Sequence, residues 1–228
     1  MNRIQVFGML SAVALVSGCA SQAPGPGAAA RPASGAGPAG MSFFVSSSNP
    51  GKGGNLGGLA GADAHCQKLA TAAGAGKKTW HAFLSTNTVN AKDRIGKGPW
   101  VNVKGVQIAK DVPDLLGATN NKINAATALT EQGKAPNYLG GTPPAPLAQP
   151  LQHDIMTGTN DDGTATANTC SNWTSGGDDV KATLGHADRL GRNAGVNSWT
   201  NIHDSQGCSL EKLAPTGSAG LIYCFAVR

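Results

Sequence analysis

Residues 219–227, with the sequence AGLIYCFAV, are apolar at nearly every position. A strand that exposes one face to water alternates apolar and polar residues, whereas a strand covered on both faces is apolar throughout. The run therefore predicts a strand in the centre of a sheet, not at its edge. Its cysteine, Cys224, is then expected to lie in the protein core.

A second strong pattern lies in residues 57–74, GGLAGADAHCQKLATAAG. Apolar residues recur there every three or four positions, which places them on one face of a helix. These residues are Leu59, Ala62, Cys66, Leu69, Ala70 and Ala73. Gly74 ends the helix, because glycine readily adopts the left-handed conformation that follows a last helical turn. Cys66 is therefore expected on the buried face of the clearest helix in the chain.

Weaker patterns predict the other elements of the domain. Strands are expected at residues 42–46, 79–85 and 169–174, a hairpin at 100–109, a helical turn at 111–116, and renewed order at 155–157. Between residues 119 and 152 the periodicity fades, and several prolines and a Gly-Gly pair interrupt the chain. We expect a long surface loop there, and loops of that length usually have a function or move.

The composition is that of a folded domain with many turns. Of the 228 residues, 40% are hydrophobic and 14% are charged, which argues against wholesale disorder. The 32 glycines and 13 prolines disfavour coiled coils and helical bundles. The net charge of +5 is mild and the basic residues do not form long runs, so a nucleic-acid partner is not expected.

The N-terminus has the pattern of an export signal. A positive start at residues 1–3 leads into an apolar run at residues 4–16. That run is shorter than the roughly 20 residues that span a bilayer. It leads into Val-Ser-Gly-Cys at residues 16–19, which resembles the bacterial lipobox, where the cysteine is acylated and becomes the first residue. The alternative is an ordinary signal peptide that contains a cysteine.

The lipobox resemblance divides the chain into a signal peptide at residues 1–18, a tether at 19–41 and a folded domain at 42–228. The tether is nearly all Ala, Gly, Pro and Ser, so it has little to bury and is expected to be flexible. Acyl chains on Cys19 would anchor the protein to a membrane without a transmembrane helix. By resemblance to sorted bacterial lipoproteins, Ala20 in place of an aspartate implies the outer membrane of the envelope.

The remaining four cysteines are Cys66, Cys170, Cys208 and Cys224. An even number of cysteines in an exported domain implies two disulfides. A zinc site made of cysteines is disfavoured, because no two of them have the close spacing of such sites. Four cysteines allow three pairings, and the spacing alone does not choose among them.

Together, the cysteines and their surroundings resemble the C-type lectin-like fold, and in particular bacterial lectin-like domains related to its endostatin-like branch. Five segments within residues 42–228 carry the resemblance: Gly57–Cys66, Ala91–Ile95, Asn172–Ser175, Gly185–Arg189 and Tyr223–Phe225. The resemblance implies an α+β domain with a mixed, twisted antiparallel sheet, one main helix and long loops. It also implies a nested pairing of the disulfides, Cys66–Cys224 and Cys170–Cys208.

Sugar-binding members of that family hold Ca²⁺ with Glu-Pro-Asn or Gln-Pro-Asp in the long loop and Trp-Asn-Asp on a later strand. This chain has Ala135-Pro136-Asn137 and Trp199-Thr200-Asn201 at the nearest matches. Both lack the carboxylate that Ca²⁺ prefers, so we expect no calcium-dependent sugar site, and ligand binding should persist in a chelator. Asn137 and an exposed Trp199 are the candidate ligand-binding residues.

Two further groups of side chains are candidates for a metal ion. Asp161 and Asp162 lie in a glycine turn that could hold Ca²⁺, although plain Asx-type turns have the same residues. The second group, a candidate for Zn²⁺, consists of His153, His186, Asp188 and His203. Zinc requires three or four such ligands to converge. Nothing in their spacing requires this, so hydrogen-bonded loop histidines are the alternative.

These patterns predict an envelope lipoprotein whose lectin-like domain binds a glycan or a protein without catalysis. The chain contains no nucleophile elbow, no HExxH motif and no phosphate-binding loop. One alternative is a structural envelope protein without a soluble ligand. The other is a metal-dependent enzyme that uses His153, His186 and His203.

The lipobox makes a direct prediction. Because Cys19 is the residue that would be acylated, the Cys19→Ala variant should remain an unmodified precursor. Metabolic labelling with a fatty acid and partitioning into detergent would measure the modification. Acyl labelling that is unchanged in the variant would show that the cysteine belongs to an ordinary signal peptide.

Overall fold

The computed structural model describes Met1 and residues 37–117, 121–139, 150–191 and 197–227. The chain divides into two units, Met1–Arg31 and Pro32–Arg228, and the helices and strands described below belong to the second. The predicted lipidation site Cys19, the signal peptide at residues 2–18 and most of the tether lie outside the described residues. Within the described residues, no helix is both long and apolar enough to cross a membrane.

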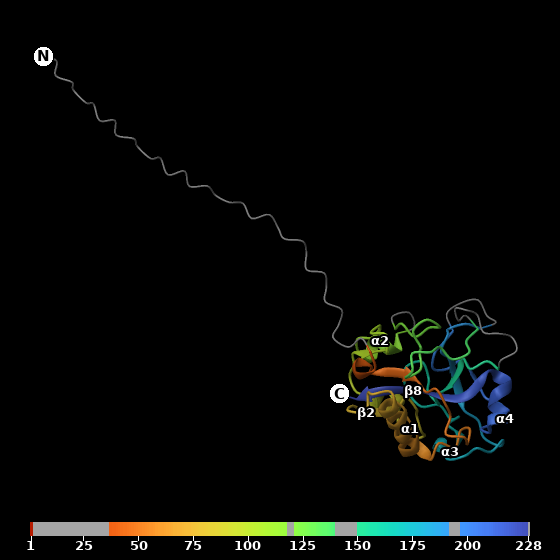
Figure 1. The fold of residues 1–228 in the computed structure, drawn as a ribbon. Coiled ribbons are helices and arrows are strands. Elements are labelled where there is room, and N and C mark those ends of the chain that lie inside the picture. The colour runs from red at the N-terminus through yellow and green to blue at the C-terminus, as the bar shows by residue number, and fades with distance from the viewer. Residues whose placement is uncertain (2–36, 118–120, 140–149, 192–196, 228) are drawn as a thin grey trace. The chain divides into compact units, whose positions relative to one another are not determined.

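The domain contains strands and short helices around one mixed sheet (Figure 1). The strands are β1 Phe43–Val45, β2 Thr79–Ala82, β3 Trp100–Val101, β4 Gln107–Ala109, β5 Asp154–Met156, β6 Thr183–His186, β7 His203–Asp204 and β8 Ser218–Val227. The helical elements are η1 Pro38–Gly40, α1 Gly58–Ala72, η2 Ala91–Asp93, α2 Val112–Leu116, α3 Cys170–Trp173, α4 Leu210–Leu213 and η3 Ala214–Thr216. The main sheet has the order β1-β8-β5-β6-β7, with β2 also paired to β8, and β3 and β4 form a separate hairpin.

Strand β8 is the centre of the sheet, as its apolar sequence predicts. It pairs antiparallel with β1 and β2 and parallel with β5. Its side chains alternate between two hydrophobic cores. Ile222, Cys224 and Ala226 belong to one core, and Leu221, Tyr223 and Phe225 belong to the other. Both faces of the strand are therefore covered, which is why its sequence shows no polar alternation.

Helix α1 covers one of these cores beside β2, close to the predicted bounds (Figure 1). Its fully buried residues are Ala62, Cys66 and Ala70, and Cys66 is bonded to Cys224 of β8. Off this apolar face, the Asp63 carboxylate accepts hydrogen bonds from the Ala82 amide at 2.8 Å and the Arg94 guanidinium at 2.7 Å. The helix is thus fixed to the sheet by apolar packing, a disulfide and an ion pair.

The second disulfide, Cys170–Cys208, completes the nested pairing. The prediction of a strand at residues 169–174 is wrong at this point. From Cys170 to Trp173 every residue has a φ between 48° and 67°, so the chain makes a left-handed turn, α3. The turn is retained because both its ends are held. Cys170 is in the disulfide, and the buried Trp173 donates its indole N–H to the Ser85 carbonyl at 2.7 Å.

The prediction of a surface loop at residues 119–152 is also partly wrong. Residues 121–139 contain no helix or strand, but Ile123, Ala128 and Tyr138 are buried in the second core. The Tyr138 hydroxyl donates to the Ala128 carbonyl at 2.7 Å, and burial raises the pKa of this phenol well above its usual value. Irregular chain can pack in the core here because its polar groups find partners within the protein.

The two disulfides should contribute unequally to stability. Their cysteines are 158 and 38 residues apart. By restricting the unfolded chain, a disulfide is expected to stabilise the fold by about 5 kcal/mol for the long loop and about 4 kcal/mol for the short one. The loss measured on removing a native disulfide is typically about 2–5 kcal/mol. The Cys66→Ala/Cys224→Ala variant should therefore unfold at lower denaturant than Cys170→Ala/Cys208→Ala, its matched control. Equal or reversed midpoints would contradict this account.

Candidate functional site

The neighbouring strands β5, β6 and β7 bring histidine and aspartate side chains together near their ends. Asp154 is the first residue of β5, His186 the last of β6, and His203 the first of β7. Asp154 and His186 are directly opposite across an antiparallel pair, which places their Cβ atoms about 5 Å apart. His203 is opposite Leu184, two residues from His186, so it lies on the same face as His186. The register of the sheet therefore creates the convergence.

His153 and Asp188 complete this group, which we call the His/Asp cluster: His153, Asp154, His186, Asp188 and His203. His153 immediately precedes β5, and its ring packs closely against the backbone of Gly217. A Cβ atom at Gly217 would lie 2.8 Å from Cδ2 of His153, and its φ of +102° also favours glycine. Gly217 thus leaves the space that the imidazole of His153 occupies.

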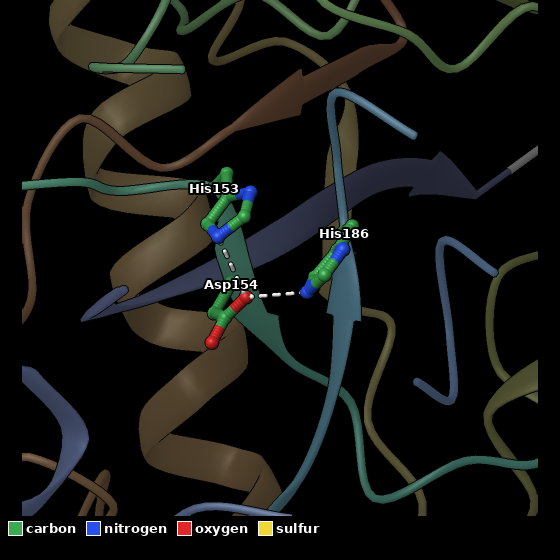
Figure 2. A group of neighbouring side chains, drawn as sticks. All are labelled: His153, Asp154 and His186. Atoms are coloured by element: carbon green, nitrogen blue, oxygen red, sulfur yellow. Dashed lines mark ion pairs between the residues drawn. The ribbon is translucent and has the colours of Figure 1, made fainter. Parts of the chain in front are cut away.

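Asp154 is the common partner of three imidazole rings. Its Oδ1 lies 3.3 Å from Nε2 of His153 and 3.0 Å from Nε2 of His186 (Figure 2). Its Oδ2 lies 3.4 Å from Nε2 of His203. Nε2 of His186 is also 3.2 Å from Nε2 of His203, and the rings of His153 and His186 are stacked with centroids 4.3 Å apart. Three Nε2 atoms therefore surround one carboxylate.

The cluster is almost completely buried, except on one side. Asp154 is fully buried and His153 and His186 are buried, whereas the His203 side chain is 36% exposed. Neither oxygen of Asp154 has a hydrogen-bond partner, although both lie at ion-pair distances from the histidines. Nδ1 of the His186 ring also lacks a hydrogen-bond partner.

Asp188 holds His153 in its orientation. Its carboxylate lies 3.2 Å from Nδ1 of His153 and accepts hydrogen bonds from the backbone N–H groups of Leu139 and Leu190, both at 3.0 Å. Burial by itself raises the pKa of Asp188, but the contact with His153 and the backbone donors outweigh burial and lower it. The carboxylate is therefore ionised, and Nε2 of His153 is left to face Asp154.

The electrostatics of His186 also favour positive charge in the cluster. Burial disfavours the charged imidazolium, but the neighbouring carboxylate of Asp154 outweighs this and raises the pKa of His186. A proton or another cation at this position is stabilised by the buried negative charge of Asp154. The arrangement can therefore hold positive charge where three imidazoles and a carboxylate meet.

The candidate calcium ligands Asp161 and Asp162 bond to other groups, as expected of a plain Asx-type turn. Oδ1 of Asp161 accepts hydrogen bonds from the hydroxyls of Ser198 and Thr200, the latter at 2.9 Å. Oδ1 of Asp162 accepts from the backbone N–H of Thr164 at 2.9 Å and from its hydroxyl. The hydrogen bonds from Thr164 lower the pKa of the exposed Asp162. Asp162 thus stabilises an Asx-type turn, and Asp161 ties that turn to residues 198–200.

The prediction that Trp199 is exposed is wrong. Only 3% of the residue is exposed, and its ring packs against Phe83 at 4.7 Å and Tyr223 at 5.2 Å between centroids. Its flanking glycines and asparagines are typical of exposed loops, but the ring fills the second core beside β8. Asn137 lies in a separate segment, where its side-chain amide donates to the Pro150 carbonyl at 2.8 Å.

A pocket of about 280 Å³, with polar and apolar lining residues, lies beside Trp199. Its lining consists of Leu116, Asp161, Arg189, Asn197, Ser198, Trp199, Asn201 and Ile202. The Arg189 guanidinium is held by the carbonyls of Ile123 and Asn197, both at 3.2 Å. The pocket therefore presents fixed amide, hydroxyl, guanidinium and carboxylate groups.

The chain matches no protein-family model and no curated protein sequence. The sequence indicated His153, His186, Asp188 and His203 as candidate ligands, and the fold brings them together. Asp154, their common partner, stands next to His153 in the sequence but was not expected to be a ligand. A pairing of β5 with β6 would have revealed it, since that register places Asp154 opposite His186. The spacing of these residues along the sequence does not indicate that register.

Asp188 should be important for stability because it satisfies three groups. The Asp188→Asn variant replaces an oxygen acceptor by an N–H₂ donor, so at least one of these groups loses its partner. We expect it to lower the free energy of unfolding by about 1–3 kcal/mol, measured by urea denaturation. The control Asp93→Asn, at an exposed carboxylate, should change stability by less than about 0.5 kcal/mol. A wild-type midpoint for Asp188→Asn would contradict the orienting role.

Proposed function

We propose that this protein is a lipid-anchored protein of the bacterial envelope whose domain at residues 42–228 has a C-type lectin-like fold and binds a glycan or protein ligand without catalysis. Two features support the fold assignment. The disulfides pair as Cys66–Cys224 and Cys170–Cys208, the nested order that the resemblance implies. One main helix also packs beside a terminal strand at the centre of a mixed sheet.

The observation that carries the binding function is the pocket beside Trp199, which combines apolar walls with several polar groups. Binding sites of this kind combine a rigid wall with a few fixed polar groups, which select the ligand by hydrogen bonding. The ring of Trp199 is held by Phe83 and Tyr223 in the core. Asp161 and Asn201 are held by neighbouring side chains, since Asn201 donates to Oδ1 of Asn160 at 3.2 Å. The polar groups are thus preorganised before a ligand arrives.

The chemistry of the pocket favours a ligand with many hydroxyl or amide groups. Amides, a hydroxyl, a carboxylate and a guanidinium can each donate to or accept from a sugar ring or a polar peptide. The volume of about 280 Å³ is at the small end for ligand pockets and suits one sugar residue or one side chain of a protein partner. We expect such binding to be independent of calcium, because Asn137 and Asn201 lack a companion carboxylate at the sequence positions where sugar-binding lectins have one.

The same pocket supports binding over catalysis. Its hydroxyl, Ser198 Oγ, contacts the carboxylate of Asp161 and accepts from the backbone N–H groups of Thr200 and Asn201 at 3.0 and 2.9 Å. A serine nucleophile instead requires a base, usually histidine, placed to take its proton. Ser198 therefore stabilises the loop that forms the pocket.

Removing polar groups from the pocket should weaken ligand binding. The variants Asp161→Ala and Asn201→Ala should each lose about tenfold in affinity or more, which corresponds to about 1.4 kcal/mol. Binding of the full chain would be measured on arrays of glycans and envelope or host proteins, with a chelator present. Asp93→Ala, at an exposed carboxylate remote in sequence, is the matched control.

The outcomes distinguish the alternatives. Saturable binding that Asp93→Ala retains and both pocket variants lose supports the proposal. Saturable binding that the pocket variants retain would move the site elsewhere on the domain. Absence of any saturable binding would favour a structural envelope protein without a soluble ligand.

A further inference from the structure

The carboxylate of Asp154 is the centre of the His/Asp cluster. It is fully buried, and neither of its oxygens has a hydrogen-bond partner. An ionised carboxylate without compensation is strongly unfavourable inside a protein, so a buried carboxyl group takes up a proton, is paired with positive charge or coordinates a metal ion. The groups that face it are imidazole nitrogens, which can be neutral ligands or protonated cations.

The distances between these atoms match the edges of a metal coordination sphere. Zn–N and Zn–O bonds of roughly 2.0–2.2 Å in a tetrahedron place neighbouring ligand atoms about 3.3 Å apart. Oδ1 of Asp154 lies 3.3 Å from Nε2 of His153 and 3.0 Å from Nε2 of His186. Nε2 of His203 lies 3.2 Å from Nε2 of His186. The ligand atoms of His153, Asp154 and His186 all lie within 4.8 Å of one another, so these three are placed to share one ion, with His203 beside Asp154 and His186.

The ligand atoms also indicate the kind of metal. Three imidazoles and one carboxylate suit zinc and other borderline transition metals, whereas calcium and magnesium prefer sites made almost wholly of oxygen. Thiolate ligands are not at hand in the described residues, because their four cysteines are all in disulfides. The composition of the cluster thus excludes a cysteine-based site and favours a His₃Asp site.

Metal-binding histidines normally donate their second ring nitrogen to a carboxylate or carbonyl, which fixes the tautomer and the orientation of the ring. Asp188 does this for His153 at a distance of 3.2 Å from Nδ1, and is itself held by two backbone N–H groups. The His203 side chain is 36% exposed, so the cluster has an open side through which an ion can enter. A ligand set, an outer carboxylate and an entry path are therefore all present.

We propose that the His/Asp cluster is a site for one divalent transition-metal ion, with Zn²⁺ as the ion its ligands suit. His153, Asp154 and His186 are the buried ligands that converge, and His203, which contacts Asp154 and His186 from the solvent side, completes the set when an ion binds. Asp188 is a positioning residue that acts through His153. The site is distinct in its residues from the pocket beside Trp199, so the metal proposal does not depend on the proposed ligand binding.

Zinc titration of the full chain tests this proposal. The purified protein would be stripped with a chelator, dialysed, and titrated with Zn²⁺ by calorimetry and against a chromophoric chelator. We expect one ion per chain, with affinity reduced about 100-fold or more by Asp154→Asn or His203→Gln and about 10–100-fold by Asp188→Asn. His65→Gln and His81→Gln, at the histidines outside the cluster, are the controls and should bind zinc as the wild type does.

Two further measurements keep the test decisive if a buried variant unfolds. His203 is partly exposed, so His203→Gln should keep the fold, which its melting curve in a chelator would establish. Zn²⁺ should raise the melting temperature of the wild type and the control variants, and much less that of His203→Gln. Co²⁺ bound in place of zinc should give the intense visible absorption of a four-coordinate site, and weaker absorption in His203→Gln.

The opposite results are equally clear. Absence of stoichiometric zinc binding to the wild type would overturn the proposal and leave protonated imidazole as the partner of Asp154. Binding that the cluster variants retain in full, or that His65→Gln abolishes, would also overturn it, because the ion would then be bound elsewhere.

Discussion

The fold depends on covering both faces of strand β8. Its side chains alternate between two hydrophobic cores, so it contributes to both, and β1, β2 and β5 all pair with its backbone. The bond from Cys224 to Cys66 then fixes helix α1 to the strand on one side. On the other side, Tyr223 and Phe225 hold the aromatic rings of the second core. The candidate site follows from the same constraint, because β5 positions Asp154 through its pairing with β8.

The sequence alone predicted those parts of the fold that depend on local periodicity. The apolar run at β8 and the helical spacing around Cys66 each contain their own signal, because burial of a strand or helix face selects residues at fixed intervals. The turn at Cys170–Trp173 could not be predicted in this way. Its left-handed backbone is maintained by a disulfide and by the contact of Trp173 with Ser85, both of which join residues far apart in the chain. Local propensity opposes that conformation.

The candidate site could be predicted only in part, for a similar reason. Histidine and aspartate residues could be recognised as candidate ligands, but their convergence depends on which strands pair and in what register. A shift of one residue in β5 or β6 would turn Asp154 or His186 to the opposite face of the sheet. Trp199 shows that local sequence can also mislead about burial. Its neighbours are typical of an exposed loop, whereas its ring is buried against Phe83 and Tyr223.

The pocket and the His/Asp cluster are connected by one short segment of chain. Ser198, Trp199 and Asn201 line the pocket, and His203 follows two residues later in the cluster. The segment is fixed to β6 by backbone hydrogen bonds from the His186 amide to the Ser198 carbonyl and from the Ile202 amide to the Leu184 carbonyl, at 2.9 and 2.8 Å. Because a packed segment moves as a unit, a cation that holds His203 against Asp154 would also restrict the residues that form the pocket wall. The two sites therefore differ in chemistry but depend on the same segment of chain, residues 198–203.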